Sequence, residues 1–269
     1  MKLIDIHAHL EHARFKEDLK DVVKRFEKIG GKLIIESGIN PATNRKALEI
    51  AEKYDLVGAS FGLYPIDALA KEIERGESNG FLRDIEEFSV DKELKWIERN
   101  ADSCIAIGEI GLDYNWKEFQ TEEMQKKQKD TFRKVLDLVR KINKPVVVHS
   151  RKAEEDAIEI LEELKMNRVV MHSFNGRKSL IQRCVNNGWS FSVPPVITRL
   201  GHFKMLVDMV PLKQLLTETD SPYLSPVAGE RNEPANVIIT IEEIARIKKI
   251  SVEEVSEKIW ENAMKVFDL

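Results

Sequence analysis

Two histidines near the start of the chain have the spacing of a metal-binding pair. His7 and His9 stand in the segment DIHAHL, directly after a short apolar run. Residues two apart on an extended segment point to the same side, as two imidazole ligands of one metal ion must. Because such pairs are common in proteins, two histidines held only by structural hydrogen bonds remain the alternative at this point.

Four more potential ligands follow apolar runs further along the chain. Glu109 ends such a run in CIAIGEIGLDY. Burying an unpaired carboxylate is costly, so this side chain should either have a partner or bind a cation. The other three are His149 in PVVVHSR, His172 in VVMHSFNG and Asp220 in LLTETDSPYL.

The elements that would position these residues alternate regularly along the chain. Short apolar or β-branched runs predict eight strands, at residues 3–6, 32–36, 56–60, 104–107, 145–148, 168–171, 189–193 and 214–217. Amphipathic stretches between them, such as 18–29, 42–53, 121–142 and 153–164, predict helices. This alternation implies parallel strands with right-handed crossovers. Eight rounds favour an α/β fold of the (β/α)8 TIM barrel type over an open doubly wound sheet, for which no GxGxxG or P-loop motif is present.

The length of the chain suits one such barrel. TIM barrels commonly have about 250 residues, so residues 1–269 are expected to form a single domain. Residues 67–100 exceed what one crossover needs, and their polar run ERGESNGFLRD is expected to join two helices of an insertion after the third strand. Residues 236–269 predict two C-terminal helices on the outside of the barrel.

A parallel barrel brings the carboxyl ends of its strands to one face, where the active sites of this fold lie. The six potential ligands follow five different strands and should converge there, an arrangement that six unrelated structural residues would not explain. Their nitrogen and oxygen atoms suit Zn, Mg, Mn, Co or Ni. A catalytic Zn site uses about three protein ligands, so six imply two divalent metal ions. His12 and His202 are expected to be solvated or packed instead.

Composition constrains the remaining properties. The formal net charge of −4 argues against a surface coated in positive charge for duplex binding, although a local basic rim would escape this sum. No apolar run approaches the roughly 18–20 residues of a membrane span, and the chain starts with the strand-like KLIDI, so a cytoplasmic protein without a membrane partner is expected. Cys104 and Cys184 lack CxxC spacing and are interpreted as reduced core residues. A monomer or a small homo-oligomer fits the sequence.

Six segments together resemble the TatD family of metal-dependent deoxyribonucleases, which belongs to the amidohydrolase superfamily of (β/α)8 barrels. In order, they are DIHAHL, AIGEIGLDY, PVVVHSR, HSFNG, ETDSPYL and RNEPANV. The resemblance implies hydrolysis of phosphodiester bonds in DNA, of the 3′–5′ exonuclease type on the end of a single strand. Some relatives instead cleave the ester that links a D-amino acid to tRNA.

The resemblance also implies roles for individual residues. His7, His9 and Asp220 would hold one metal ion, and His149 and His172 would hold the second. Glu109 would bridge the two ions. A water activated by both ions would attack phosphorus, with Asp220 orienting the water and taking its proton.

Two arginines are the cations expected to bind a substrate phosphate. Arg151 lies two residues after His149, and Arg231 lies in the segment GERNEP. A guanidinium group can bind a phosphate through two parallel hydrogen bonds. Each arginine could equally be a surface or ion-pair residue, and only the resemblance favours the phosphate role.

The segment FGLYPID departs from the family pattern. In the family this segment usually reads GxHPH, whereas this chain has Tyr64 at the first histidine and Asp67 one residue beyond the second. Tyr64 could donate a hydrogen bond to a phosphate or stack on a base, and it is taken as a substrate contact, with packing against the insertion as the alternative. The sequence therefore predicts weaker or redirected nuclease activity with the metal ions still bound.

Two other functions compete with the nuclease. One is a different metallohydrolase on the same scaffold, acting on aminoacyl-tRNA, a phosphoester, a lactone or an amide. The other is a barrel that binds nucleic acid without chemistry. The complete set of six potential metal ligands, called the metal-type residues below, disfavours this alternative. Other branches of the superfamily bridge their metal ions with a carboxylated lysine, a position that Glu109 occupies here.

Overall fold

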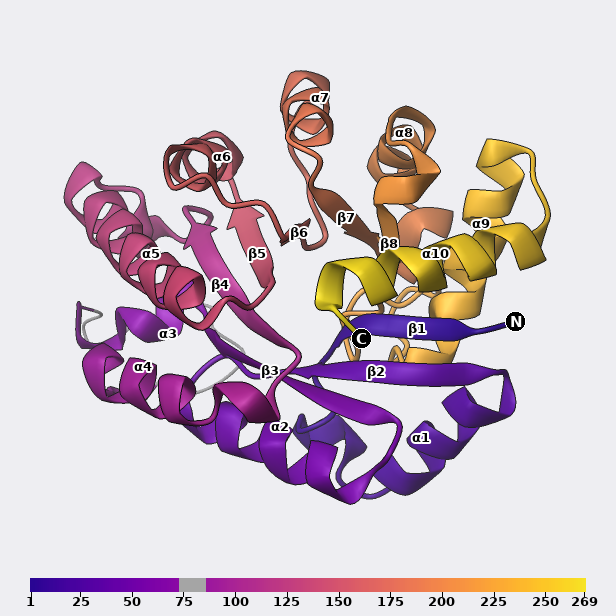
Figure 1. The fold of residues 1–269 in the computed structure, drawn as a ribbon, viewed down its shortest axis with the longest axis horizontal. Helices are drawn as coiled ribbons and strands as arrows, with labels where there is room; N and C mark the ends of the chain where they lie inside the picture. Colours follow the sequence, from indigo (N-terminus) through magenta and orange to yellow (C-terminus); the bar gives the residue numbers. More distant parts are fainter. Residues whose placement is uncertain (73–85) are drawn as a thin grey trace.

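Eight parallel strands form one sheet in the order β1 to β8 (Figure 1). The computed structural model describes residues 1–72 and 86–269. The strands are β1 Leu3–Ala8, β2 Gly31–Ser37, β3 Val57–Leu63, β4 Ala106–Asp113, β5 Val146–Arg151, β6 Val169–Met171, β7 Ser190–Val193 and β8 Leu215–Thr217. Each strand pairs with the next one in the sequence, as repeated right-handed crossovers require.

The first and last strands bring the sheet back on itself. Ala8 and Ser221 form an isolated parallel bridge. The backbone N–H of His9 donates to the carbonyl oxygen of Ser221 at 2.8 Å, and the Thr217 hydroxyl donates to the carbonyl oxygen of Ile4 at 2.6 Å. The sheet is thus a nearly closed barrel, and the predicted (β/α)8 TIM barrel is confirmed.

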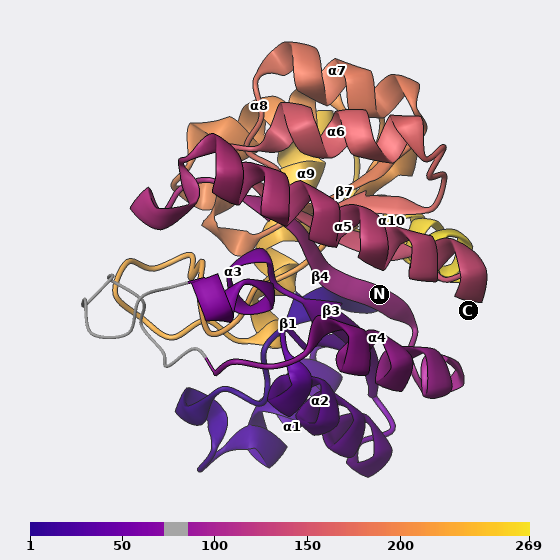
Figure 2. The ribbon, with the colours of Figure 1, turned by 90° about the vertical axis from the view of Figure 1, so that its left-hand side faces the viewer.

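Helices surround the barrel and follow its strands (Figure 2). They are α1 Leu19–Lys28, α2 Pro41–Lys53, α3 Pro65–Ala68, α4 Val90–Arg99, α5 Glu122–Ile142, α6 Glu154–Glu163, α7 Lys178–Asn186, α8 Gly201–Met209, α9 Val237–Lys248 and α10 Val252–Phe267. Local signals set their starts. At α2, for example, Asn40 accepts a hydrogen bond from the Thr43 N–H at 3.0 Å, and Pro41 occupies the first helical position.

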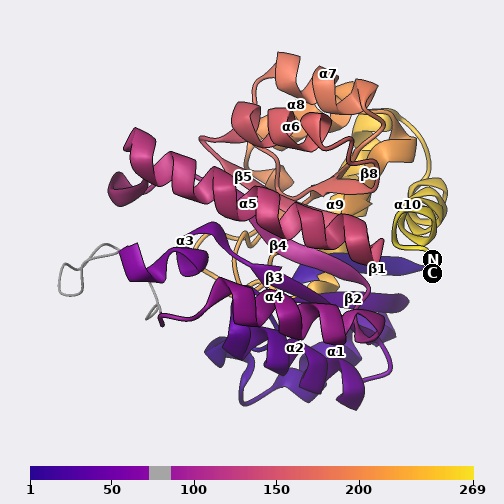
Figure 3. The same cartoon turned by 60° about the vertical axis from the view of Figure 1, so that its left-hand side comes forward.

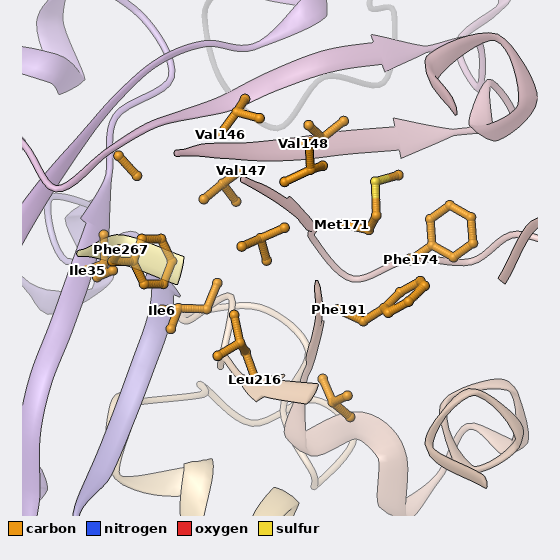
Figure 4. Close-up of a cluster of buried hydrophobic side chains, with 14 of the residues drawn as sticks. Ile6, Ile35, Val146, Val147, Val148, Met171, Phe174, Phe191, Leu216 and Phe267 are labelled. Carbon is orange, nitrogen blue, oxygen red and sulfur yellow. The ribbon is translucent and has the colours of Figure 1, made fainter. Parts of the chain in front are cut away.

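The core consists of strand residues that are buried on both faces of the sheet. Val146, Val147 and Val148 of β5 are all fully buried, which is why this strand reads as an unbroken apolar run. Figure 4 shows these valines with Met171 of β6 and Phe191 of β7. This packing fixes the strand ends that carry the polar residues.

Helix α10 covers the end of the barrel where the strands begin. The Asn262 side chain donates to the carbonyl oxygens of Leu212 and Leu215, at 2.7 and 2.8 Å. Figure 3 shows α10 beside both termini, with α3 at the opposite end of the molecule. The two predicted C-terminal helices are therefore present as α9 and α10.

The predicted insertion after the third strand has helices at both ends of its described part. It begins with α3 and a 3-10 helix at Ala70–Glu72, and it ends with α4. The run ERGESNGFLRD, expected to join two helices, occupies residues 74–84 and lies outside the described residues. Within residues 1–72 and 86–269, no helix has both the length and the apolar character that a membrane crossing demands. Cys104 and Cys184 are buried and unpaired.

Several strands continue beyond their predicted carboxyl ends. The fourth was predicted at 104–107 and the fifth at 145–148, but β4 is Ala106–Asp113 and β5 is Val146–Arg151. Glu109 and His149 therefore lie within strands and not beyond them. The hydrogen-bond ladder continues here because Gly111 still pairs with His149, whereas the sequence signal stops at the last apolar residue.

Candidate metal centre

All six metal-type side chains meet at the carboxyl end of the barrel. They come from β1, β4 and β5 and from the loops after β1, β6 and β8. Their ligand atoms form three overlapping groups, each within 4.8 Å. The groups are His7, His9 and Glu109; Glu109, His149 and His172; and His7, His172 and Asp220.

Glu109 lies at the centre of this cluster. Its Oε1 is 2.7 Å from His149 Nδ1 and 3.8 Å from His172 Nε2. Its Oε2 is 3.5 Å from His7 Nε2 and 3.9 Å from His9 Nε2. Burial alone would raise the pKa of Glu109, but the surrounding histidines, foremost His149, hold this pKa well below its usual range. The carboxylate is therefore ionised.

Asp220 approaches the cluster from the loop after β8. Its Oδ1 lies 3.3 Å from His9 Nε2 and 3.7 Å from His7 Nε2. The residue has a left-handed backbone with φ of 53°, a conformation that aspartate tolerates better than most residues. Its backbone N–H donates to the His7 carbonyl oxygen at 2.8 Å, which holds the loop beside β1.

Ser37 at the end of β2 contacts the outer nitrogens of two histidines. Its hydroxyl lies 3.1 Å from His7 Nδ1. Its carbonyl oxygen, which can only accept a hydrogen bond, lies 3.0 Å from His9 Nδ1, so that nitrogen carries a hydrogen. Both rings consequently direct Nε2 toward the cluster.

Two buried carboxylates that the sequence analysis did not single out hold the other two histidines. Glu218 Oε2 lies 2.6 Å from His172 Nδ1 and accepts a hydrogen bond from the Ser192 hydroxyl at 2.6 Å. Asp113 Oδ2 lies 3.2 Å from His149 Nε2. Both carboxylates are fully buried. Their only sequence signal is an acidic residue close to a predicted ligand, in TETD and in GEIGLD.

The donor set fits divalent metal ions. Every histidine directs one ring nitrogen into the cluster and the other to a protein oxygen, as the histidine ligands of metal sites do. Four imidazoles and two carboxylates without sulfur suit borderline and hard divalent cations. Such ions would replace the protons that the cluster now shares between histidine and carboxylate.

The histidine pKa values follow from these contacts. Burial by itself lowers them, but nearby carboxylates raise the pKa of His9 and His172 to about 9 and that of His149 to about 10. The pKa of His7 is lowered by burial and by the neighbouring His172. In the absence of metal, three of the four histidines are therefore protonated at neutral pH.

Asp5, also not singled out from the sequence, joins β1 to the loop that carries Asp220. Its side chain accepts hydrogen bonds from the backbone N–H groups of Thr219, at 2.9 Å, and of His7, at 3.2 Å. The carboxyl is fully buried, and burial raises its pKa to about 8. Asp5 thus sets the position of Asp220 relative to the histidine pair.

A glycine in β3 allows the backbone of Glu109 to approach closely. A Cβ atom at Gly62 would lie against the backbone N and O atoms of Glu109 and the carbonyl oxygen of Gly38, closer than van der Waals contact allows. The Gly of FGLYPID is therefore needed because it admits the backbone of a central metal-type residue.

A cleft of about 720 Å³ opens beside the cluster. Its wall includes five of the six metal-type residues, all but His7, together with apolar side chains, among them Phe88, Trp116 and Tyr223. Arg151 is the one lysine or arginine among the described residues that line it. The cleft therefore brings together one predicted phosphate contact, an apolar wall and the metal-type cluster.

Tyr64 also lines the cleft, but its hydroxyl points into the protein. The hydroxyl donates to Asp113 Oδ2 at 2.8 Å, and the ring packs edge-on against His149 with centroids 4.9 Å apart. Asp67 is buried and accepts a hydrogen bond from the Asn40 side chain at 2.8 Å. Asp67 therefore does not lie where it would repel a cation in the cleft.

Arg231 lies apart from the cleft lining. Its guanidinium binds both oxygens of Asp18 at 2.7 Å and lies over the Phe15 ring, 4.7 Å from the centroid. These contacts explain why the pKa of Arg231 is raised. The predicted phosphate role of Arg231 would require this ion pair to open.

His12 and His202, predicted to be solvated or packed, lie outside the three ligand groups. His12 Nδ1 accepts a hydrogen bond from the Arg14 N–H at 3.1 Å. His202 Nε2 lies 3.0 Å from the carbonyl oxygen of Phe174. Local contacts thus account for both histidines.

Sequence comparisons match the chain over nearly its whole length. The family described as TatD related DNase matches residues 4–268. The chain is 36% identical over 266 residues to the human protein Deoxyribonuclease TATDN3, with 98% of this chain and 94% of that protein covered. It is 33% identical to the Uncharacterized metal-dependent hydrolase MJ1582 of Methanocaldococcus jannaschii, with 99% and 97% covered.

Solved structures show the same fold. The TatD homologue YJJV of Escherichia coli superposes with a TM-score of 0.85 at 24% identity, covering 99% of this chain and 98% of that one. A TatD family hydrolase of Entamoeba histolytica gives a TM-score of 0.83 at 26% identity, covering 98% and 97%. The barrel fold is therefore shared with these TatD structures.

Proposed function

The chain belongs to the TatD family and is a metal-dependent hydrolase of ester bonds, and from this premise we propose that it cleaves phosphodiester bonds of DNA. We further propose that it uses two divalent metal ions and removes nucleotides from the 3′ end of a single strand. The observation that carries the proposal is the cluster of four imidazoles around Glu109 at the base of a cleft. A metal-dependent nuclease needs metal ions and substrate to meet in this way.

The proposed division of ligands keeps together the histidine pairs of two of the three groups, and it adds Asp220 to the pair His7 and His9, whose Nε2 atoms lie 3.7 and 3.3 Å from its Oδ1. His7, His9 and Asp220 would hold one ion, and His149 and His172 the other. Glu109 would bridge them, a role supported by its membership of two groups and by its separate oxygens, of which Oε1 faces His149 and Oε2 faces His7.

The bound ions would supply Lewis acidity, making a water more acidic and polarising the phosphate. Asp220 lies at the edge of the cluster and also lines the cleft. Burial would raise its pKa, but His9 and the other histidines lower it, so the carboxylate is ionised and can accept a proton at neutral pH. Arg151 extends into the same cleft as a partner for a substrate phosphate.

The cleft favours the end of a single strand over a duplex. Duplex binding relies on many phosphate contacts from lysine and arginine, and Arg151 is the one such residue in the described lining. The apolar wall that includes Trp116 offers a surface for an unpaired base. These two features support the exonuclease form of the proposal.

The test is an assay with single-stranded oligonucleotide labelled at either end, using metal-free protein reconstituted with Mg²⁺, Mn²⁺ or Zn²⁺. We expect stepwise loss of 3′ nucleotides. Asp220→Asn should reduce kcat by about 10²- to 10⁴-fold, because the proton acceptor is lost. His202 lies outside the ligand groups, so His202→Gln serves as the matched control and should retain kcat.

Three results would count against the proposal. Turnover that persists unchanged in Asp220→Asn would exclude the assigned proton acceptor, and internal cuts would exclude the exonuclease form. No nucleotide release, together with turnover of an aminoacyl-tRNA, lactone or amide, would identify a different metallohydrolase on this scaffold.

A further inference from the structure

His149 lies between two carboxylates that bind its two ring nitrogens. Glu109 Oε1 is 2.7 Å from Nδ1, and Asp113 Oδ2 is 3.2 Å from Nε2. The ring therefore turns Nδ1 to the metal-type cluster, whereas the other three histidines turn Nε2 to it. Asp113 is the group that selects this orientation. Its ionised carboxylate accepts a hydrogen bond from the Nε2–H group, so in the neutral ring, the form that binds metal, Nδ1 is the nitrogen with a lone pair.

Asp113 is itself held rigidly. Its Oδ1 accepts the Asn115 N–H at 2.8 Å. Its backbone N–H and carbonyl oxygen bond the amide group of Gln128, both at 2.8 Å. Because the side chain is fully buried, it cannot exchange these partners for bulk water without opening the strand end.

Tyr64 completes the arrangement from the cleft side. Its hydroxyl has one hydrogen, and it donates this hydrogen to Asp113 Oδ2 at 2.8 Å. The same oxygen faces His149 Nε2, so Tyr64 and His149 converge on one carboxylate oxygen from different sides. A hydroxyl committed in this way does not donate to a phosphate in the cleft.

We propose that Tyr64 and Asp113 are positioning residues that fix the ring of His149 for metal binding. The inference rests on the proposed metal-dependent function and adds to it the pair that sets one ligand. It replaces the role of Tyr64 as a substrate contact. Loss of the Tyr64 hydroxyl then weakens metal binding and lowers kcat, while the KM for DNA stays unchanged because no contact to substrate is removed.

The experiment titrates metal-free full-length protein with Mn²⁺ alone in a calorimeter, before any activity is measured. Asp113→Asn should weaken Mn²⁺ binding by about 10- to 100-fold, the usual cost of losing a partner of a histidine ligand. Tyr64→Phe keeps the ring against His149 and removes only the hydroxyl. It should therefore weaken Mn²⁺ binding by about tenfold.

Tyr114→Phe is the matched control. Tyr114 also donates to an aspartate at 2.8 Å, but its partner is Asp156, which bonds Lys129 and none of the six metal-type residues. This variant loses a tyrosine–aspartate hydrogen bond of the same length. It should retain the Mn²⁺ affinity of the wild type.

The outcomes are distinguishable. If the wild type binds Mn²⁺ and both Tyr64→Phe and Asp113→Asn bind it equally well, the positioning role is wrong while the proposed function stands. A rise in KM for DNA in Tyr64→Phe, with Mn²⁺ affinity unchanged, would restore the substrate contact. Failure of the wild type itself to bind Mn²⁺, Mg²⁺ or Zn²⁺ would overturn the proposed function and the inference together.

Discussion

To bind metal ions as proposed, three histidines of the cluster must first lose protons, namely His9, His149 and His172. Their pKa values are raised to about 9, 10 and 9, with acidic neighbours outweighing the effect of burial. Only a neutral imidazole ligates, so metal uptake at pH 7 should release protons, and affinity should increase with pH until about pH 10. Calorimetric titration with Zn²⁺ at pH 7 in two buffers of different ionisation enthalpy measures this release. Equal apparent enthalpies in both buffers would contradict it.

At this scale, the sequence predicted which residues carry metal-type atoms but not what holds them. Six residues could be recognised because each follows an apolar run. Asp113 and Glu218 could not, because their role depends on contacts far along the chain, such as the 46 residues that separate His172 from Glu218. Asp113 and Glu218 look like any other acid in a chain with 33% charged residues.

The strand pair β3 and β4 fixes the central carboxylate, and Gly62 is the residue that permits their approach. In Gly62→Ala the new methyl group would press on the backbone of Glu109 and Gly38, which cannot rotate away as a side chain can. We expect a loss of about 1–3 kcal/mol in the free energy of unfolding, together with weaker metal binding. Urea denaturation of the metal-free protein measures the first effect.

Gly201→Ala is the control for this substitution. A Cβ atom at Gly201 meets nothing within 4 Å, and the residue begins α8. Alanine should therefore be neutral or stabilise this helix by up to about 1 kcal/mol. If Gly62→Ala unfolds at the same urea concentration as Gly201→Ala, the close approach of β3 and β4 does not constrain the site.

The order of elements was predictable, while the ends of the elements beside the site were not. Alternating apolar and amphipathic runs gave every strand because each strand is buried on both faces. The signal failed where β4 and β5 continue through polar residues to Asp113 and Arg151. At those positions polar side chains belong to the metal-type cluster or lie beside it. An apolar pattern therefore does not extend as far as the backbone hydrogen bonds of the strand.

The whole molecule is acidic, and its cleft offers little positive charge to DNA. The net charge is −4, and the described cleft lining sets Arg151 against Glu11, Glu86 and Glu87. If one or two phosphates are neutralised, log KM for single-stranded DNA should change with log salt with a slope of about 0.7 to 1.4. Steady-state assays with oligonucleotides at several KCl concentrations provide the slope. A slope near 3 would mean that about four phosphates are bound and that the protein contacts a longer stretch of the DNA backbone.

The barrel itself followed from counting eight rounds of alternation, but its closure did not. The contacts that join β8 to β1, such as Thr217 to Ile4, link residues 213 positions apart. No local pattern in the sequence specifies them. They follow from the twist and tilt that bring the edges of an eight-stranded sheet together.

The contact between β1 and the loop after β8 joins residues that are synthesised at very different times. His7 and His9 emerge from the ribosome more than two hundred residues before Asp220, which lies beside them in the structure next to the Ala8–Ser221 bridge. Before Asp220 has been synthesised, a nascent chain holds these two histidines without that carboxylate. If all six residues bind metal as proposed, the complete site can form only after translation has passed Asp220 and the barrel has closed.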